Sequence, residues 1–404
     1  MNYDAFFDEK LGELKAAGNY RVFAELERCA GRFPSARRYD DGGDVEDVTV
    51  WCSNDYLGMG QHPDVLAAMI QAIETHGAGA GGTRNISGTN HLHVLLENAL
   101  AALHGKEKAL LFTSGYVANL ATLATLGARL PNCTIYSDAL NHNSMIEGMR
   151  QSKAHKKIWK HNDPEDLDRM LAEDDPANAK LVAFESVYSM DGDIAPIAEI
   201  LDVCEKHGAL SFLDEVHAVG MYGHHGAGVS ERDNVADRID IIQGTLAKAF
   251  GVIGGYIAGK AKMVDFVRSF GNAFIFTTAL PPAVAAGALK SVEIVRDSPE
   301  MRDRHQDRAA RLKRRLSENG LPVMPSETHI VPVLVGDPVK CRAATDMLMD
   351  RYGIYVQPIN YPTVPKGTER LRLTPSPYHS DEAIERLVSA LSEVWASLSL
   401  QKAA

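Results

Sequence analysis

Two short segments in the middle of the chain place an acid, a histidine and a lysine directly after predicted strands. Asp214 and His217 follow the apolar stretch at residues 208–213. A carboxylate in the position of Asp214 keeps a pyridine nitrogen protonated, so that the ring accepts electrons from a substrate carbanion. His217, three residues further on, is able to reach an oxygen on such a ring. Taken alone, the same stretch is equally typical of a capped helix with a solvated histidine.

Lys248 lies in the second segment, within the small-residue loop GTLAKAFG at residues 244–251. Such a loop removes water from the amine, and the neutral amine is the form that makes a Schiff base. Thr245, three positions earlier, offers a hydroxyl for a phosphate group. A single lysine in a loop is usually solvated. Its glycine and apolar neighbours, and its place one strand–helix unit after Asp214, favour the chemical role.

Two further strand ends carry candidate residues. The run KALLF leads into a helix start whose exposed backbone N–H groups attract a phosphate. The residues at that start are Ser114, Gly115 and Tyr116. His142 follows the run at residues 132–137 and is able to stack on a planar cofactor. The alternatives are an ordinary N-capped helix and a buried histidine with structural partners.

The elements that position these residues follow a regular rhythm. From residue 48 to residue 294, short apolar runs alternate with amphipathic helical patterns. This rhythm predicts an α/β fold with a mostly parallel central sheet and helices on both faces. Ligands of such sheets lie beyond the carboxyl ends of the strands, where the candidate residues fall. Residues 1–47 are expected to form an N-terminal arm with a helix, and residues 295–404 a smaller C-terminal α+β domain.

The composition narrows the functional class. The chain has 404 residues and a formal net charge of -11, which argues against a general affinity for nucleic acid. No apolar run approaches the ~20 residues that span a bilayer, and the N-terminus lacks a signal or transit pattern, so a soluble cytoplasmic protein is expected. The five cysteines are scattered without CxxC spacing, which predicts neither disulfides nor a metal site.

Several motifs in a fixed order carry a resemblance to a known family. Besides GTLAKAFG, they are SNDYLGM (residues 53–59), GTRNISGT (82–89), LNHNSMIEG (140–148), ESVYSMDGD (185–193), DEVHAVG (214–220), GGY (254–256) and RLRLTPSP (370–377). In these motifs the chain resembles the α-oxoamine synthases, which are homodimeric pyridoxal-phosphate enzymes of fold type I. The resemblance runs from about residue 20 to residue 395, and this combination is far more specific than any single motif.

The resemblance implies a role for each candidate toward pyridoxal 5′-phosphate. Lys248 holds the cofactor as a Schiff base, Asp214 pairs with the ring nitrogen, and His142 stacks on the ring and acts as a proton donor. Ser189 and His217 contact a ring oxygen, and residues 114–116 and Thr245 bind the phosphate. Thr277 or Thr278 adds a hydroxyl from the partner subunit, so that the active sites lie at the subunit interface.

Within this family the chain is most similar to the members that condense glycine with succinyl-CoA and release CoA and CO2. The resemblance implies that Arg372 and Asn54 hold the glycine carboxylate. For the succinyl-CoA side, the matching residues are Arg21, Thr83 and Asn85 at the carboxylate, Thr363 in a lid, Ser137 as a further contact and Lys156 at the CoA phosphates. Four of these residues have alternative interpretations: a surface arginine for Arg21, a helix cap for Thr83, a turn residue for Asn85 and a solvated basic run around Lys156.

Two departures and two alternative functions remain open. His224 and His225 stand where relatives commonly have Pro-Arg, and adjacent histidines without cysteines or a second carboxylate make a poor metal site. The nearest enzymatic alternative is a 2-amino-3-oxobutyrate CoA ligase or another α-oxoamine synthase. A catalytically silent scaffold subunit is the alternative from another class, and such a subunit is expected to lose Lys248.

Overall fold

The computed structural model describes residues 1–39 and 42–403, which belong to two compact units. The first, here called the sheet unit, comprises Met59–Tyr188 and Ile194–Arg302. The second, called the terminal unit, comprises Met1–Gly58, Ser189–Asp193 and Asp303–Ala404. The three segments expected from the sequence, with boundaries at residues 47 and 294, stay a prediction.

A seven-stranded sheet forms the centre of the sheet unit. In spatial order its strands are β4 (Lys108–Phe112), β10 (Gly255–Gly259), β9 (Ile241–Thr245), β8 (Leu210–Asp214), β7 (Lys180–Glu185), β5 (Thr134–Asp138) and β6 (His155–Trp159). The five strands from β9 to β6 run parallel, while β10 is antiparallel to both β9 and β4. The carboxyl ends of the parallel strands therefore meet at one edge, called here the carboxyl edge.

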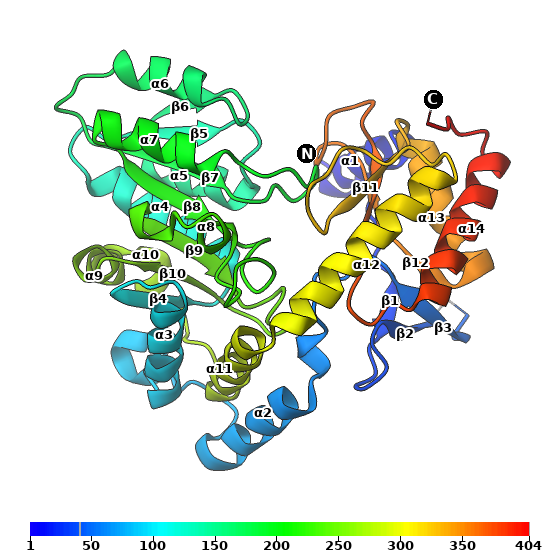
Figure 1. Ribbon diagram of the computed structural model, residues 1–404, viewed down its shortest axis with the longest axis horizontal. Helices are drawn as coiled ribbons and strands as arrows, with labels where there is room; N and C mark the ends of the chain where they lie inside the picture. The colour runs from blue at the N-terminus through cyan, green and yellow to red at the C-terminus, as the bar shows by residue number, and fades with distance from the viewer. Residues whose placement is uncertain (40–41, 404) are drawn as a thin grey trace. The chain divides into compact units, whose positions relative to one another are not determined.

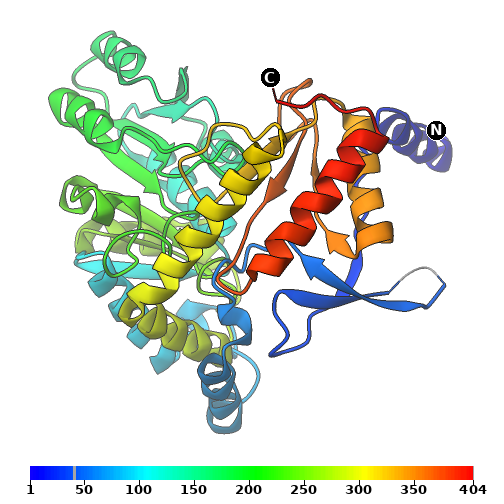
Figure 2. The ribbon, with the colours of Figure 1, turned by 45° about the vertical axis from the view of Figure 1, so that its right-hand side comes forward.

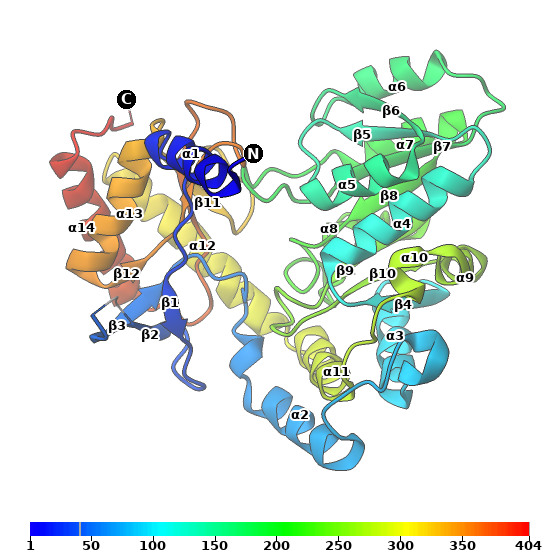
Figure 3. The ribbon, with the colours of Figure 1, turned by 180° about the vertical axis from the view of Figure 1, so that it is seen from behind.

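Helices cover both faces of this sheet. They are α2 (Pro63–His76), α3 (His91–Leu103), α4 (Gly115–Arg129), α5 (Asn143–Ser152), α6 (Pro164–Ala172), α7 (Ile197–His207), α8 (Val229–Arg232), α9 (Ala261–Phe270), α10 (Asn272–Ile275) and α11 (Pro282–Asp297). Figure 1 shows α7 over one face, and Figure 3 shows α4 and α5 over the other. Because both faces are covered, β7 is buried along its whole length, as its unbroken apolar run requires. The prediction of a mostly parallel α/β fold is confirmed.

The terminal unit contains two small sheets and the helices packed on them. The first sheet has β1 (Glu25–Glu27), β2 (Ser35–Tyr39), β3 (Val45–Val50) and β12 (Ile354–Tyr355), and the second has β11 (Val331–Leu334), β14 (Arg370–Leu373) and β13 (Pro358–Ile359). The helices are α1 (Tyr3–Ala16), α13 (Pro338–Tyr352), α14 (Asp381–Ser397) and the part of α12 (Pro299–Glu318) from Asp303 onward.

The core of the terminal unit lies between its helices and strands. Leu312 of α12, Leu371 of β14 and Trp395 of α14 are all fully buried in one cluster. Figure 2 shows α12 and α14 running side by side, and Arg315 pairs with Glu385 across them at 2.6 Å. This packing holds β14, whose arginines are described below, in a rigid frame.

Candidate active site

Asp214 ends β8 at the carboxyl edge of the sheet and is held in one orientation. Its carboxylate is buried, with 4% of the residue exposed. Oδ2 accepts a hydrogen bond from Asn119 Nδ2 at 2.7 Å, and Oδ1 accepts one from the backbone N–H of Val216 at 2.8 Å. Each oxygen keeps a lone pair for another donor, so the carboxylate suits a protonated ring nitrogen.

His142 belongs to the same hydrogen-bond network. Ser144 donates its backbone N–H to His142 Nδ1 at 3.2 Å, so the proton of the neutral ring lies on Nε2. The Ser144 hydroxyl accepts from Asn119 Nδ2 at 3.0 Å, which links His142 to the amide that orients Asp214. Partial enclosure lowers the pKa of His142, and the positive charge of Lys248 lowers it further.

Glu185 ends the neighbouring strand β7 and lies directly opposite Asp214 in the register of the two strands. It is 3% exposed, and its Oε1 accepts the backbone N–H of His142 at 2.6 Å. Burial, together with the adjacent negative charge of Asp214, raises the pKa of Glu185 well above its usual value. Two like charges so close in a buried place favour one protonated partner. The raised pKa of Glu185 therefore favours a protonated Glu185 beside the Asp214 carboxylate.

Lys248 follows β9 in a hydrogen-bonded loop and is half-buried. The backbone carbonyl of Lys248 accepts from Gly251 N at 2.9 Å, and Leu246 N donates to Gly254 O at 3.0 Å. Burial raises the pKa of Asp214, and the Lys248 charge acts against that shift, so the amine and the carboxylate share one electrostatic environment. The structure brings Lys248, Asp214 and His142 together, as the sequence predicts.

The start of α4 lies against the end of β9. Ser114 caps α4 by accepting Val117 N at 3.1 Å. A Cβ added to Gly115 would come within 3.3 Å of Thr245 Oγ1, so the helix N-terminus and the Thr245 hydroxyl are neighbours. A helix N-terminus beside a hydroxyl is suited to a phosphate. In the structure Thr245 Oγ1 donates to Gly254 O at 3.0 Å.

Arg372 and Arg370 lie two positions apart on β14 in the terminal unit and are both buried. Arg370 pairs with the Asp191 carboxylate at 2.6 Å. Arg372 donates instead to the backbone oxygen of Ser189 at 2.6 Å, to Tyr56 Oη at 2.9 Å and to Asn54 Oδ1 at 3.4 Å. Among the ion pairs of the described residues none involves Arg372. Its charge is therefore available for a carboxylate ligand.

Arg21 and Thr363, which the sequence assigns to the acyl side, lie together in the terminal unit. Arg21 Nη2 donates to Thr363 Oγ1 at 3.4 Å, although 342 residues separate the two in the chain. Both side chains are exposed and line one surface pocket. The guanidinium is thus oriented by the segment that the sequence interprets as a lid.

The other predicted acyl residues, Thr83 and Asn85, belong to the sheet unit and flank an anchored arginine. Arg84 pairs with Glu97 through both of its terminal nitrogens, at 2.8 and 3.1 Å. Thr83 forms an isolated antiparallel bridge with Thr278, so the loop at residues 82–89 lies beside the predicted phosphate-binding threonines. Asn85 is exposed, and Thr277 is half-buried.

The remaining predicted residues have varied surroundings. Ser137 is 1% exposed, and its hydroxyl accepts from Asn141 Nδ2 at 2.9 Å. Tyr116 lies edge-on to His142 at 6.4 Å, whereas Lys156 is exposed on the edge strand β6. His217 is buried beside Asp214 in the chain. The roles assigned to these residues stay predictions.

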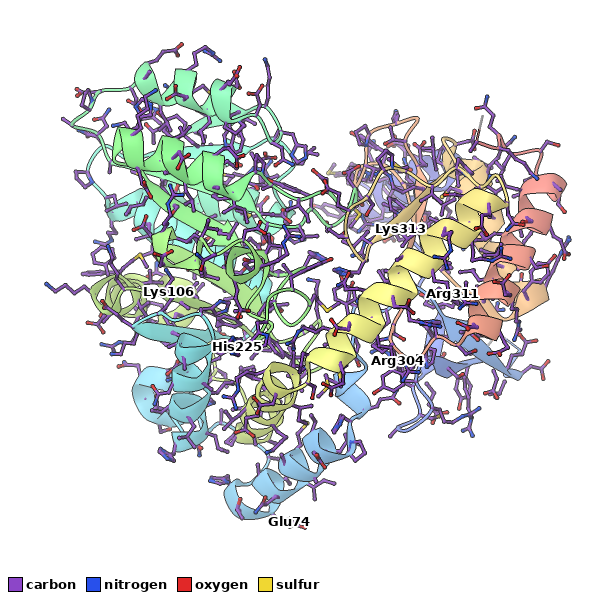
Figure 4. The ribbon with its side chains drawn as sticks, in the orientation of Figure 1. Glu74, Lys106, His225, Arg304, Arg311 and Lys313 are labelled. Carbon is purple, nitrogen blue, oxygen red and sulfur yellow. The ribbon has the colours of Figure 1, made fainter. Side chains whose placement is uncertain are left out.

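The His224–His225 pair has a structural partner. His225 Nδ1 pairs with Glu231 Oε1 at 2.7 Å, and Figure 4 labels this histidine in the sheet unit. No group of three or more metal-binding side chains occurs in the described ranges. All five cysteines are free. None of the helices in the described part of the chain has the length and apolar character that a membrane crossing needs.

Sequence reasoning missed four residues of the two sites. Asn119 and Ser144 orient Asp214 and His142, Glu185 is the second acid, and Tyr56 supports Arg372. Glu185 and Tyr56 lie within quoted motifs, and the strand-end position of Glu185 matches that of Asp214. Ser144 also lies within a quoted motif, two residues after His142. Asn119 carries no such signal, because it is one polar residue near the start of an otherwise ordinary helix.

The residues of the sheet unit fit pyridoxal 5′-phosphate. The start of α4 and Thr245 match the phosphate, the oriented Asp214 carboxylate matches the ring nitrogen, and Lys248 supplies an amine in the same environment. The fit rests on three parts of the cofactor, the phosphate, the ring nitrogen and the carbon that bonds to an amine, each matched by a group of the required chemistry.

Comparison with known proteins identifies the family. The model of the family described as aminotransferase class I and II matches residues 46–391. A 5-aminolevulinate synthase of Rhizobium meliloti (strain 1021) is 59% identical over 403 residues and is covered, like this chain, to 100%. The solved Sphingomonas wittichii serine palmitoyltransferase superposes with a TM-score of 0.90 at 30% identity, over 98% of each chain. Another solved structure, described as SPT with PLP, gives a TM-score of 0.91 at 31% identity and the same coverage. The chain therefore belongs to the 5-aminolevulinate synthase family within aminotransferase class I and II.

Proposed function

We propose that the chain condenses glycine with succinyl-CoA, releasing CoA and CO2, to form 5-aminolevulinate, the first step of tetrapyrrole and haem biosynthesis. It is a pyridoxal-phosphate-dependent acyltransferase. The observation that carries the proposal is the full-length 59% identity to a protein of that activity, combined with the Lys248–Asp214–His142 cluster.

The chain's own residues supply binding and proton transfer around the cofactor. When bound, pyridoxal phosphate acts as an electron sink that stabilises negative charge at the Cα of glycine. Lys248 would hold the cofactor through its amine, and as a free amine it would remove a proton from that Cα. Asp214 keeps the ring nitrogen protonated, and Asn119 and the Val216 N–H hold the carboxylate in place for this.

His142 is the proposed proton donor to the departing CoA thiolate. Its Nδ1 accepts from the Ser144 N–H, so Nε2 carries the transferable proton. The lowered pKa keeps the ring neutral between turnovers. Negative charge that develops on the sulfur raises the pKa of the ring, so the ring takes up a proton from solvent and, as the imidazolium, gives its Nε2 proton to the thiolate. The Glu185 contact to the His142 backbone fixes the loop from which the ring projects.

The two substrates carry carboxylates, and the chain offers a guanidinium for each. Arg372, buried among neutral acceptors, is proposed to bind the glycine carboxylate with help from Asn54. Arg21, oriented by Thr363, is proposed to bind the distal carboxylate of succinyl-CoA, and Thr83 and Asn85 of the sheet unit are proposed, each by itself, as further donors to the acyl group. A shorter or apolar acyl chain would leave this second set of donors without a partner, which costs affinity.

A homodimer with its active sites at the interface completes the proposal. Ile86 and Phe276 are 77% and 78% exposed and flank the predicted residues Asn85 and Thr277. Large apolar side chains in such positions are typical of a surface that a second copy covers. The cytoplasmic location expected from the sequence stays a prediction.

One assay tests the reaction and separates its alternatives. Purified protein with pyridoxal phosphate is given glycine and a panel of acyl-CoA thioesters, and CoA release and product identity are measured. Succinyl-CoA is expected to be the preferred thioester, with 5-aminolevulinate as product. Preference for acetyl-CoA would identify a 2-amino-3-oxobutyrate CoA ligase instead, and no turnover with any thioester would favour a scaffold subunit. The variant Lys248→Ala is the matched inactive control.

A further inference from the structure

A buried column of rings supports Arg372 in the terminal unit. Tyr56 accepts a hydrogen bond from Arg372 Nη2 through its hydroxyl at 2.9 Å. The Tyr56 ring meets the ring of His329 edge-on, with centroids 4.5 Å apart. His329 in turn lies 5.3 Å from the ring of His305. Tyr56 is 1% exposed and both histidines 0%, so the column is enclosed by protein.

The loop that leads into His329 also fixes a second acceptor of Arg372. The hydroxyls of Ser326 and Thr328 donate to Gly192 O at 3.2 and 2.9 Å. Gly192 belongs to the short segment Ser189–Asp193. The backbone carbonyl of Ser189 in this segment accepts a hydrogen bond from Arg372 Nε. A Cβ on Gly192 would lie 2.5 Å from Ser326 Oγ, so the two segments are in close contact. The position of His329 is thus coupled to both sides of the guanidinium.

The column is electrically neutral at neutral pH. Burial lowers the pKa of His329 well below its usual value, and electrostatic repulsion from the Arg372 charge lowers it further. Burial likewise lowers the pKa of His305 to about 4. A neutral ring supports Tyr56 without competing for Arg372, whereas a carboxylate in this place would attract the guanidinium and a cation would repel it.

We propose that His329 is a positioning residue for the substrate carboxylate. His329 holds Tyr56 in the orientation in which its hydroxyl accepts a hydrogen bond from Arg372. This contact fixes the orientation of the Arg372 guanidinium toward the substrate carboxylate. His329 itself does not touch substrate. The inference rests on the proposed function, which makes the substrate carboxylate that of glycine, and it extends that function by a residue beyond the Arg372–Asn54 pair.

The test compares His329→Ala with His329→Phe in the holoenzyme. Glycine affinity is measured by isothermal titration calorimetry without acyl-CoA, and KM and kcat by CoA release. His329→Ala is expected to raise the glycine Kd and KM about tenfold, because Arg372 loses a fixed acceptor, with kcat and the succinyl-CoA KM within about twofold. His329→Phe restores the ring contact and is expected to return the glycine KM to near the wild-type value.

His379→Ala is the matched control. His379 is 1% exposed in the same unit, but its ring lies 3.9 Å from Trp51 and not against Tyr56. This control is expected to lower Tm without raising the glycine Kd. An unchanged glycine Kd in His329→Ala, or an equal rise in His379→Ala, would overturn the positioning role. Wild-type protein that binds glycine without turning over succinyl-CoA would refute the proposed function alone, and the glycine Kd values would still decide the role of His329.

Discussion

Arg370 and Arg372 have the same residue type, the same strand and nearly the same burial, yet they meet different partners. Arg370 is matched by the Asp191 carboxylate, while Arg372 is surrounded by a carbonyl, an amide and a phenol. A buried charge with only neutral partners is costly unless a ligand completes its surroundings. At the scale of single residues, the identity of the nearest acceptor separates a structural arginine from a binding one.

Arg372→Lys is expected to raise the glycine KM about 10- to 100-fold, because an ammonium replaces the planar fork that holds a carboxylate with two parallel hydrogen bonds. Steady-state kinetics at saturating succinyl-CoA measure this. Arg370→Lys is the matched control and is expected to lower Tm by several degrees with a glycine KM near wild type, because its partner is internal. Equal KM changes in both variants would contradict the assignment.

Glu185→Gln is expected to change how stability depends on pH. Burial raises the pKa of Glu185 above its usual value of 4.5, so the folded state binds a proton that the unfolded state loses. The stability contributed by this proton is fully present below about pH 4.5 and is lost as pH rises through the folded-state value.

Glutamine mimics the protonated acid, so the Tm of Glu185→Gln relative to wild type should rise as the pH is raised from 4.5. Thermal unfolding of the cofactor-free protein across this range measures the difference. Its activity should remain, because glutamine still accepts the His142 N–H. A Tm difference that stays constant with pH would show that Glu185 is ionised in the folded protein.

At the scale of elements, the phosphate site depends on how closely a helix start approaches two strands. A Cβ on Gly255, at the start of β10, would lie 2.4 Å from the backbone of Ser114 and Gly115. Only a glycine allows β10 to pass the N-terminus of α4 at this distance. The backbone N–H groups of α4 are thereby kept beside Thr245, which belongs to the neighbouring strand β9.

Gly255→Ala is therefore expected to displace the start of α4 and to weaken pyridoxal-phosphate binding by about tenfold or more. Cofactor Kd from absorbance titration of the apoprotein measures this. The control is Gly12→Ala in α1, where an added Cβ meets no atom within 4 Å. The control should bind the cofactor as wild type does. Unaltered cofactor affinity in Gly255→Ala would exclude this helix start as the phosphate site.

The loop at residues 82–89 allows a second test at the scale of elements, that of the role of Thr83 in acyl-CoA selectivity. Arg84 anchors the loop through Glu97, so Thr83 can be changed without releasing it. Thr83→Val keeps the shape but removes a hydroxyl, and should broaden acyl-CoA acceptance by bringing the kcat/KM values for butanoyl- and succinyl-CoA closer together. Initial rates with the two thioesters measure the ratio. Unaltered discrimination would remove Thr83 from the acyl pocket.

At the scale of the whole molecule, the protein is proposed to be a dimer. In this dimer, Thr277 or Thr278 of one subunit contributes a hydroxyl to the active site that contains Lys248 of the other. Two inactive variants can then complement each other. A heterodimer of Lys248→Ala with the double variant Thr277→Ala/Thr278→Ala keeps one site with native residues from both chains. Random exchange makes half of the dimers mixed, so about a quarter of wild-type activity is expected.

Activity after mixing and refolding the two variants measures this complementation, and sedimentation of the wild type gives the oligomeric state. Mixing two batches of Lys248→Ala is the control and should restore nothing. Activity equal to the mean of the separate variants would place the threonines and Lys248 in the same subunit. A monomer in sedimentation would refute the dimer outright.

The sequence by itself determined the features that depend on local pattern. Runs of apolar residues predicted the buried strands, because a strand covered on both faces must be apolar throughout, and the parallel arrangement then placed Asp214, His142 and Lys248 at one edge. The order of several motifs indicated the family, and the full-length identity confirms it.

Only the tertiary structure decided which groups face each other across long separations in the chain. Arg372 meets Tyr56 from 316 residues away, and the Glu185–Asp214 pairing follows from strand register. Neither the neutral surroundings of Arg372 nor the ring column behind it has a signal in residue spacing. The physical reason is that burial and pairing energies depend on the nearest atoms in space, and for these side chains those atoms come from distant segments.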